Sequence, residues 1–108
     1  MRVNVTLIHK LLVNPEEVNE SGWEVAKYEY TKVAMGVFEK ENEIDICEKA
    51  YMQSQHISQS WPLNEEWLHT YVERNRSTMA GDRVKIHMID SEDVVYEVSD
   101  FGFTRVVA

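Results

Sequence analysis

Residues 81–98, GDRVKIHMIDSEDVVYEV, decide the fold that we predict for this chain. In the first half, Val84, Ile86 and Met88 alternate with polar residues, and a similar alternation returns in VVYEV at 94–98. Alternation with a period of two is typical of a strand that buries one face. Because the polar segment DSED separates the two runs, we expect them to pair as a β-hairpin.

Further strands are predicted on both sides of this hairpin. Residues 103–107, FTRVV, follow a break and form a last short strand, and residues 2–8, RVNVTLI, repeat the alternation of period two. From Trp23 to Glu39, β-branched and aromatic residues favour strand. That stretch is longer than an ordinary strand, so we predict a division near Tyr30.

A first helix is predicted over residues 42–55, NEIDICEKAYMQSQ. Asn42 is followed three residues later by Asp45, a spacing that resembles a capping box, in which both side chains satisfy free N–H groups of the first turn. The polar segment before the preceding strand, residues 14–22, is predicted as a loop with one helical turn. Residues at positions i, i+3 and i+7 give the first helix a predicted buried stripe: Ile44, Cys47 and Tyr51.

A second helix is predicted from Glu65 to about Asn75, capped by Asn64. It follows Trp61-Pro62, where the proline restricts the preceding residue to extended conformations. Residues 1–108 then form a single α+β domain: a mainly antiparallel sheet with two helices packed on one face and a C-terminal β-hairpin.

The charge and composition narrow the class of protein. The chain has 108 residues, 11 Lys and Arg against 19 Asp and Glu, and a formal net charge of −8. This acidic balance argues against a protein that binds the phosphate backbone, so we expect no direct contact with nucleic acid. A single cysteine excludes an internal disulfide. With no apolar run that could span a bilayer and no signal segment, we expect a cytoplasmic protein without membrane contact.

Acidic residues near the first predicted helix form one candidate site. An acidic face of this kind can dock on a basic protein surface or imitate the charges of nucleic acid. The alternative is a solvated surface that keeps a small protein soluble. The candidate partner-binding residues are Glu39, Glu41, Glu43, Asp45 and Glu48.

The segment after the second predicted helix is the other candidate. Arg74 and Arg76, with the hydroxyl of Ser77, have the chemistry to hold a phosphate or a nucleotide. The alternative is a turn in which Gly81 takes a positive φ and Asp82 caps the chain.

Catalytic and metal-binding patterns are weak. Cys47 lies on an apolar stripe, and nucleophilic catalysis would need Cys47 or Ser77 to meet a histidine in space. The four histidines lack the short spacing of metal ligands: His9, His56, His69 and His87. We therefore expect no enzyme activity, no metal and no cofactor.

The C-terminal third resembles a known family. The run Arg76-Ser77-Thr78-Met79-Ala80-Gly81-Asp82, then a hairpin with Tyr96, then Phe101-Gly102-Phe103, is similar to the closing pattern of small YodL-like proteins. In that family, R-S-x-S-x-G-D-x-V precedes a hairpin that ends in S-F-G-F or a similar run. The resemblance covers roughly residues 31–107. Met79 stands where the family often has Ser, and Arg83 where an apolar residue is usual.

The resemblance implies an accessory protein of a phage, a plasmid or another mobile element, in a bacterial cytoplasm, with no assigned activity. Our leading hypothesis is a non-enzymatic protein whose acidic face binds a host protein with a basic surface. Such binding would inhibit a host-defence or nucleic-acid-processing complex, as anti-restriction and anti-CRISPR proteins do. The alternative is a small ligand-binding or nucleotide-binding module that uses Arg74, Arg76 and Ser77. The sequence is also compatible with a homodimer.

Overall fold

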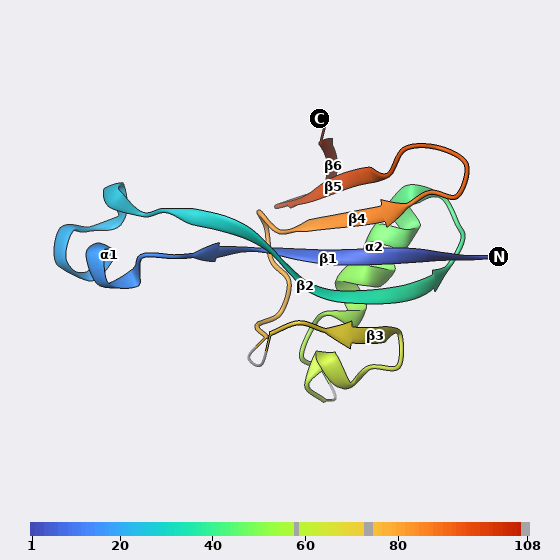
Figure 1. The fold of residues 1–108 in the computed structure, drawn as a ribbon, viewed down its shortest axis with the longest axis horizontal. Helices are drawn as coiled ribbons and strands as arrows, with labels where there is room; N and C mark the ends of the chain where they lie inside the picture. The colour runs from blue at the N-terminus through green and yellow to red at the C-terminus, as the bar shows by residue number, and fades with distance from the viewer. Residues whose placement is uncertain (58, 73–74, 107–108) are drawn as a thin grey trace.

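The computed structural model describes residues 1–57, 59–72 and 75–106. Within them, six strands form one antiparallel sheet in the order β3-β2-β1-β4-β5-β6 (Figure 1). The strands are β1 (Arg2–Leu12), β2 (Tyr28–Glu39), β3 (Trp67–Thr70), β4 (Arg83–His87), β5 (Val94–Ser99) and β6 (Gly102–Val106). The helical elements of the same residues are α1 (Pro15–Ser21), α2 (Glu43–Gln53) and the single 3₁₀ turns η1 (Trp23–Val25) and η2 (Trp61–Leu63). The predicted α+β class and the C-terminal hairpin are confirmed.

The hairpin predicted from residues 81–98 is present as β4 and β5. Val84 lies opposite Tyr96, and Ile86 lies opposite Val94. All four side chains are buried, as the alternation predicts. The last strand, β6, pairs with β5 along its length.

A long arm is formed by β1 and β2. The two strands pair from Arg2 opposite Glu39 to Leu12 opposite Tyr28, whereas β4 pairs with β1 only over residues 4–8. The outer part of the pair therefore extends beyond the sheet, with α1 and η1 at its end (Figure 1). The predicted division near Tyr30 is wrong, because β1 offers β2 a continuous partner and a bulge at Leu7/Ile8 accommodates the irregularity.

The tip of the arm is closed by one side chain. Asn14 donates from Nδ2 to the carbonyl of Val25 (2.9 Å) and accepts at Oδ1 from the backbone N–H of Lys27 (2.8 Å). The helical turn predicted in residues 14–22 is α1.

Helix α2 covers one face of the sheet, where it contacts β2 and β4 (Figure 1). The predicted cap is confirmed: the backbone N–H of Asp45 donates to Oδ1 of Asn42 (2.9 Å). The predicted stripe is right for Cys47 but wrong for Ile44, which is exposed. The helix buries a face rotated by part of a turn, made of Ile46, Cys47 and Ala50, with Tyr51 half-buried.

The helix predicted from Glu65 to Asn75 is wrong. Residues 67–70 instead form the edge strand β3, because β2 supplies hydrogen bonds to this segment: Val37 N–H donates to the carbonyl of Glu66 (3.1 Å), and Tyr71 N–H donates to that of Val33 (2.9 Å). Asn64, the predicted cap, donates its side-chain amide to the carbonyl of Gln53 instead (2.8 Å). Residues 73–74 of the prediction lie outside the described residues.

Two tryptophans fix η2 and β3 against the end of α2. Trp61 and Trp67 are buried and meet edge to face, with ring centroids 5.5 Å apart. The indole N–H of Trp67 donates to Gln53 at the end of α2 (2.9 Å). Burial of aromatic rings with satisfied N–H groups gives this region its core.

A substitution at Gly36 tests the close approach of β3 to β2. A Cβ at this position would collide with the backbone oxygen of Glu66 and lie 2.9 Å from Cε3 of Trp67. Since backbone atoms yield poorly, we expect Gly36→Ala to lower the free energy of unfolding by about 1–3 kcal/mol. Urea denaturation of both proteins measures this difference. A change of less than about 0.5 kcal/mol, typical of surface substitutions, would contradict the close approach.

Candidate functional site

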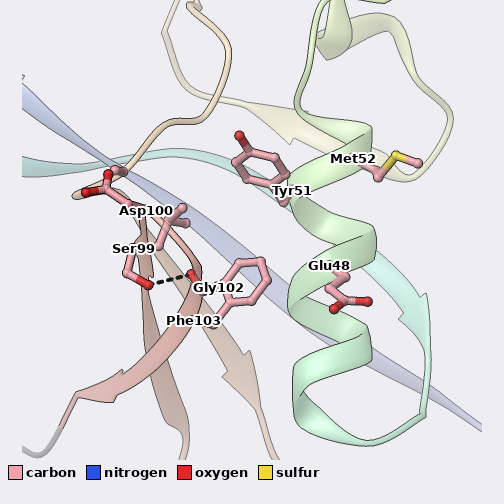
Figure 2. Close-up of a pocket in the computed structure, with 9 residues that line it drawn as sticks. Glu48, Tyr51, Met52, Ser99, Asp100, Gly102 and Phe103 are labelled. Carbon is pink, nitrogen blue, oxygen red and sulfur yellow. Dashed lines mark hydrogen bonds between the residues drawn. The ribbon is translucent and has the colours of Figure 1, made fainter.

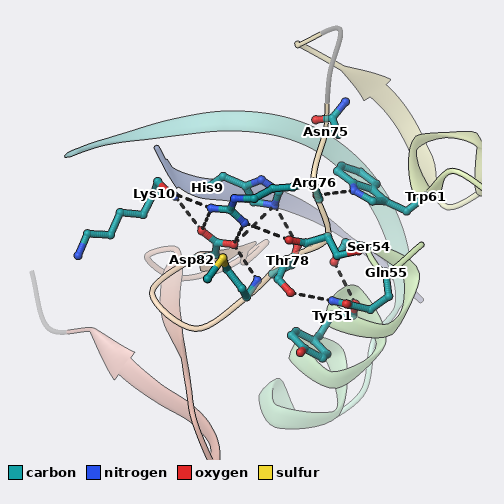
Figure 3. Close-up of polar contacts among 12 residues, drawn as sticks. His9, Lys10, Tyr51, Ser54, Gln55, Trp61, Asn75, Arg76, Thr78 and Asp82 are labelled. Atoms are coloured by element: carbon teal, nitrogen blue, oxygen red, sulfur yellow. Dashed lines mark hydrogen bonds and ion pairs between the residues drawn. The ribbon is translucent and has the colours of Figure 1, made fainter. Parts of the chain in front are cut away.

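The most buried charged group is the carboxylate of Asp82, just before β4 (Figure 3). Its two oxygens accept from both terminal nitrogens of the Arg76 guanidinium (2.6 and 2.8 Å). They also accept from the backbone N–H groups of Lys10 and Met79 (2.8 Å each). Burial alone would raise the pKa of Asp82, but these hydrogen bonds outweigh it and the pKa lies below its usual value. Asp82 is therefore a charged structural centre.

His9 lies beside this centre and is neutral. Its Nε2 shares a hydrogen bond with Oγ1 of Thr78 (3.0 Å) and lies 3.8 Å from the Asp82 carboxylate. Burial lowers the pKa of His9 to about 4; Asp82 opposes this shift and Arg76 adds to it. The ring is almost completely enclosed, so it has no access to a substrate.

The predicted phosphate loop is placed around the same centre. Arg76 directs its guanidinium at Asp82 and at the carbonyl of Lys10 (3.0 Å). Oγ of Ser77 accepts from the backbone N–H of His56 (3.0 Å). Gly81 has the predicted positive φ, 96°. Arg74 lies outside the described residues. A phosphate would have to compete with Asp82 for Arg76, so the observed contacts are those of a structural turn.

The candidate nucleophiles are not arranged for catalysis. Cys47 is buried, and its pKa is raised to about 12, first by burial and then by the charges of Glu43 and Glu48. Ser77 meets His56 through the histidine backbone, and the His56 ring bonds instead to the carbonyl of Asn75 (2.8 Å). In the described part of the chain, no group of three His, Cys, Asp or Glu side chains could hold a metal ion.

The predicted acidic residues have different roles. Glu39 pairs with Arg2 (3.4 Å), and Glu41 pairs with Lys49 (2.6 Å). These two pairs are exposed, so they hold the side chains only weakly.

The acidic residues of α2 itself differ from one another. Oε1 of Glu43 accepts from the hydroxyl of Tyr96 (2.8 Å), which ties the start of α2 to β5 and raises the pKa of Tyr96. Asp45 completes the cap, accepting from Nδ2 of Asn42 (2.6 Å). Glu48 is exposed and lies on the side of α2 that faces β5 and β6 (Figure 2).

A groove separates α2 from the β5–β6 hairpin (Figure 2). Its volume is about 510 Å³. Tyr51 and Phe103 form an edge-to-face pair across it, with ring centroids 6.3 Å apart. Glu48 stands on the helix side and Asp100 on the hairpin side, and next to Asp100 the ring of Phe101 is fully exposed. The remaining apolar wall comes from Met52, Ala80 and Val98.

Only part of this groove is predictable from the sequence. The predicted acidic set contains Glu48 but not Asp100, because Asp100 is distant in sequence from the first predicted helix. The Phe101-Gly102-Phe103 run carries the family resemblance but does not by itself predict a groove. It places one ring in the groove and one in solvent.

The comparisons with known proteins give no relative. No protein-family model, curated protein or solved structure matches the chain. The resemblance to YodL-like proteins therefore stays a prediction made from residues. No helix in the described ranges is long and apolar enough to cross a membrane.

The buried histidine predicts a pH dependence of stability. His9 has a pKa of about 4 in the folded protein, against 6.5 when exposed, so below pH 6.5 the unfolded chain binds a proton that the folded chain rejects. The free energy of unfolding should fall by about 3 kcal/mol between pH 6.5 and 4. Urea denaturation at intervals from pH 7 to pH 4 measures it.

The matched variant is His9→Gln, whose amide can still bond Thr78 but does not titrate. It should remove most of this loss above pH 4, while Asp82, with its lowered folded pKa, still costs stability at lower pH. Equal pH profiles for the two proteins between pH 6.5 and 4 would show that His9 is not buried in its neutral form.

Proposed function

We propose that this chain is a non-enzymatic binding protein that docks a protein partner in the groove between α2 and the β5–β6 hairpin. The observation that carries the proposal is an apolar groove with a carboxylate on each side, Glu48 and Asp100, and the fully exposed ring of Phe101 beside it. Buried aromatic anchors supply much of the affinity at protein interfaces, and exposed apolar surface beside a groove marks interaction sites.

The charges of the groove indicate the chemistry of the partner. Glu48 and Asp100 favour lysine or arginine side chains on either side of an apolar residue that packs on the Tyr51–Phe103 ring pair. Glu41 is exposed but pairs with Lys49 (2.6 Å), so it adds little to the charge of the groove. Glu43 and Asp45 support this surface by fixing the beginning of α2 rather than by facing solvent freely.

The proposed biological context of this function rests on the family resemblance. We propose an accessory protein of a phage or mobile element that acts in the bacterial cytoplasm. Host-defence and nucleic-acid-processing enzymes carry basic grooves for their substrates. An acidic protein that occupies such a groove inhibits the enzyme, which is the activity that we propose.

Charge reversal in the groove tests the proposal. A tagged protein is used to capture partners from a bacterial lysate, and the captured partner is purified and titrated by calorimetry at two salt concentrations. Glu48→Lys with Asp100→Lys should weaken binding at least about tenfold, because two attractive charges become repulsive. Binding by the unaltered protein should also weaken at high salt.

The matched control is Glu16→Lys with Glu17→Lys, which makes the same change of charge on α1 at the far end of the arm. It should leave the affinity within about twofold, since α1 lies at the far end of the arm and salt screens exposed charges that are well separated. If both double variants weaken binding equally, the attraction comes from the net charge of the chain. If neither does, the groove is not the docking site.

A further inference from the structure

The second face of the sheet is open. Among the described residues, α2 lies against one face, and no helix covers the other. The strand register assigns to this open face five basic residues and two acidic ones, Glu39 and Glu97, and Asp93 from the β4–β5 turn adds a third carboxylate beside Lys85 (3.8 Å). The basic residues are Arg2, Lys10, Lys32, Arg83 and Lys85. A chain with a net charge of −8 thus has one face of the opposite sign.

Three tyrosines share this face with the basic residues, and each ring has a cation over it. Nζ of Lys10 lies 4.9 Å from the ring centroid of Tyr28. Cζ of Arg83 lies 4.0 Å from that of Tyr30. Nζ of Lys32 lies 4.7 Å from that of Tyr71. We call these six residues the basic–aromatic face. Each cation–ring pair joins an aromatic surface to a positive charge at one point.

These side chains are accessible. Tyr28, Tyr30 and Tyr71 are 46, 43 and 47% exposed. Glu97 on this face pairs with Arg83 (3.2 Å) and accepts from the hydroxyl of Tyr30 (3.2 Å). It therefore holds one ring in position, and among the described residues neither Lys10 nor Lys32 forms an ion pair with an acid.

We propose that the basic–aromatic face binds single-stranded nucleic acid. Bases stack on the tyrosine rings, while Lys10, Lys32 and Arg83 move from the rings to the phosphates. A sheet with exposed aromatic rings and flanking cations is suited to unpaired bases, because every base has a flat face and no base-specific hydrogen bond is needed. A duplex keeps its bases stacked inside and cannot use the rings.

The spacing of the rings fits separate bases. Tyr28 and Tyr30 point to the same side of β2, and two residues of an antiparallel strand advance about 6.8 Å. That is about twice the 3.4 Å rise between stacked bases, so each ring can take a different, unstacked base. Tyr71, from the segment after β3, offers a third ring beside Lys32.

This surface is independent of the groove, which lies on the other side of the sheet. It also departs from our expectation of no direct contact with nucleic acid, which was based on net charge. The acids lie mostly on α1, α2 and the turns. The net charge of the whole chain is therefore negative although the open face is positive. Their repulsion will make binding weak and sensitive to salt.

Fluorescence anisotropy tests the proposal with three labelled probes: a 20-nucleotide oligouridine, a 20-nucleotide oligothymidine and a 20-base-pair duplex. Both single strands should bind at low salt, at least about tenfold more tightly than the duplex. The two single strands distinguish an RNA site from a DNA site. The logarithm of affinity should fall against the logarithm of salt with a slope of about −2, as expected for three cations on a single strand.

Variants identify the residues. Tyr28→Ala with Tyr30→Ala should weaken binding at least about tenfold with little change of slope, since each stacked base is lost independently of charge. Lys10→Gln with Lys32→Gln should flatten the salt slope by about 1.4. The matched control, Phe101→Ala with Arg105→Ala, removes a ring and a cation from outside the face and should bind as the unaltered protein does.

Three results would overturn the proposal. The first is no binding of either single strand at about 100 μM protein and low salt, the weak end of non-specific affinities. The second is equal loss in the control and the face variants. The third is full competition by polyglutamate at equal charge, which would show a site for any polyanion. Urea denaturation of each variant ensures that a loss of binding is not a loss of folding.

Discussion

The carboxylate of Asp82 is the constraint on which the arrangement of the chain depends. It joins β1, through the N–H of Lys10, to the segment before β4, through Arg76 and Met79. The backbone carbonyl of Asp82 accepts from Val98 in β5 (2.8 Å), and that of Arg76 accepts from the indole of Trp61 (2.7 Å). A buried carboxylate without partners is costly, so this charge holds β1 to the segment before β4, and the backbone carbonyls of Asp82 and Arg76 extend the connection to β5 and η2.

With those elements fixed, the sheet separates opposite charges. Helix α2 brings Glu48 to one side, while the register of β1, β2 and β4 brings Lys10, Lys32 and Arg83 to the other. Each strand contributes to both sides because its side chains alternate. The two proposed binding surfaces therefore lie on opposite faces of one sheet. Residues of either surface can be substituted without changing the other surface.

Local patterns predicted the parts of the fold whose partners are near in sequence. The alternation in β4 and β5 and the cap at Asn42 belong to single elements, and both are confirmed. The prediction of a helix over residues 65–75 was wrong because the indole of Trp67 bonds to α2 and the backbone of Glu66 bonds to β2. Local sequence spacing does not show these contacts. The groove and the basic–aromatic face were missed for the same reason. Arg83 reaches the ring of Tyr30 only through the pairing of three strands.

The length of the β1–β2 arm sets the distance between α1 and the rest of the sheet. Beyond residue 8, β1 has β2 as its strand partner and β4 no longer constrains it. Adding two residues to each strand would move α1 outward by about 6.8 Å and leave every side chain on its own face. Adding one residue to each would turn the outer side chains over. The arm can therefore change its length by two residues per strand at a time. Each such change moves α1 relative to the sheet and leaves the core unchanged.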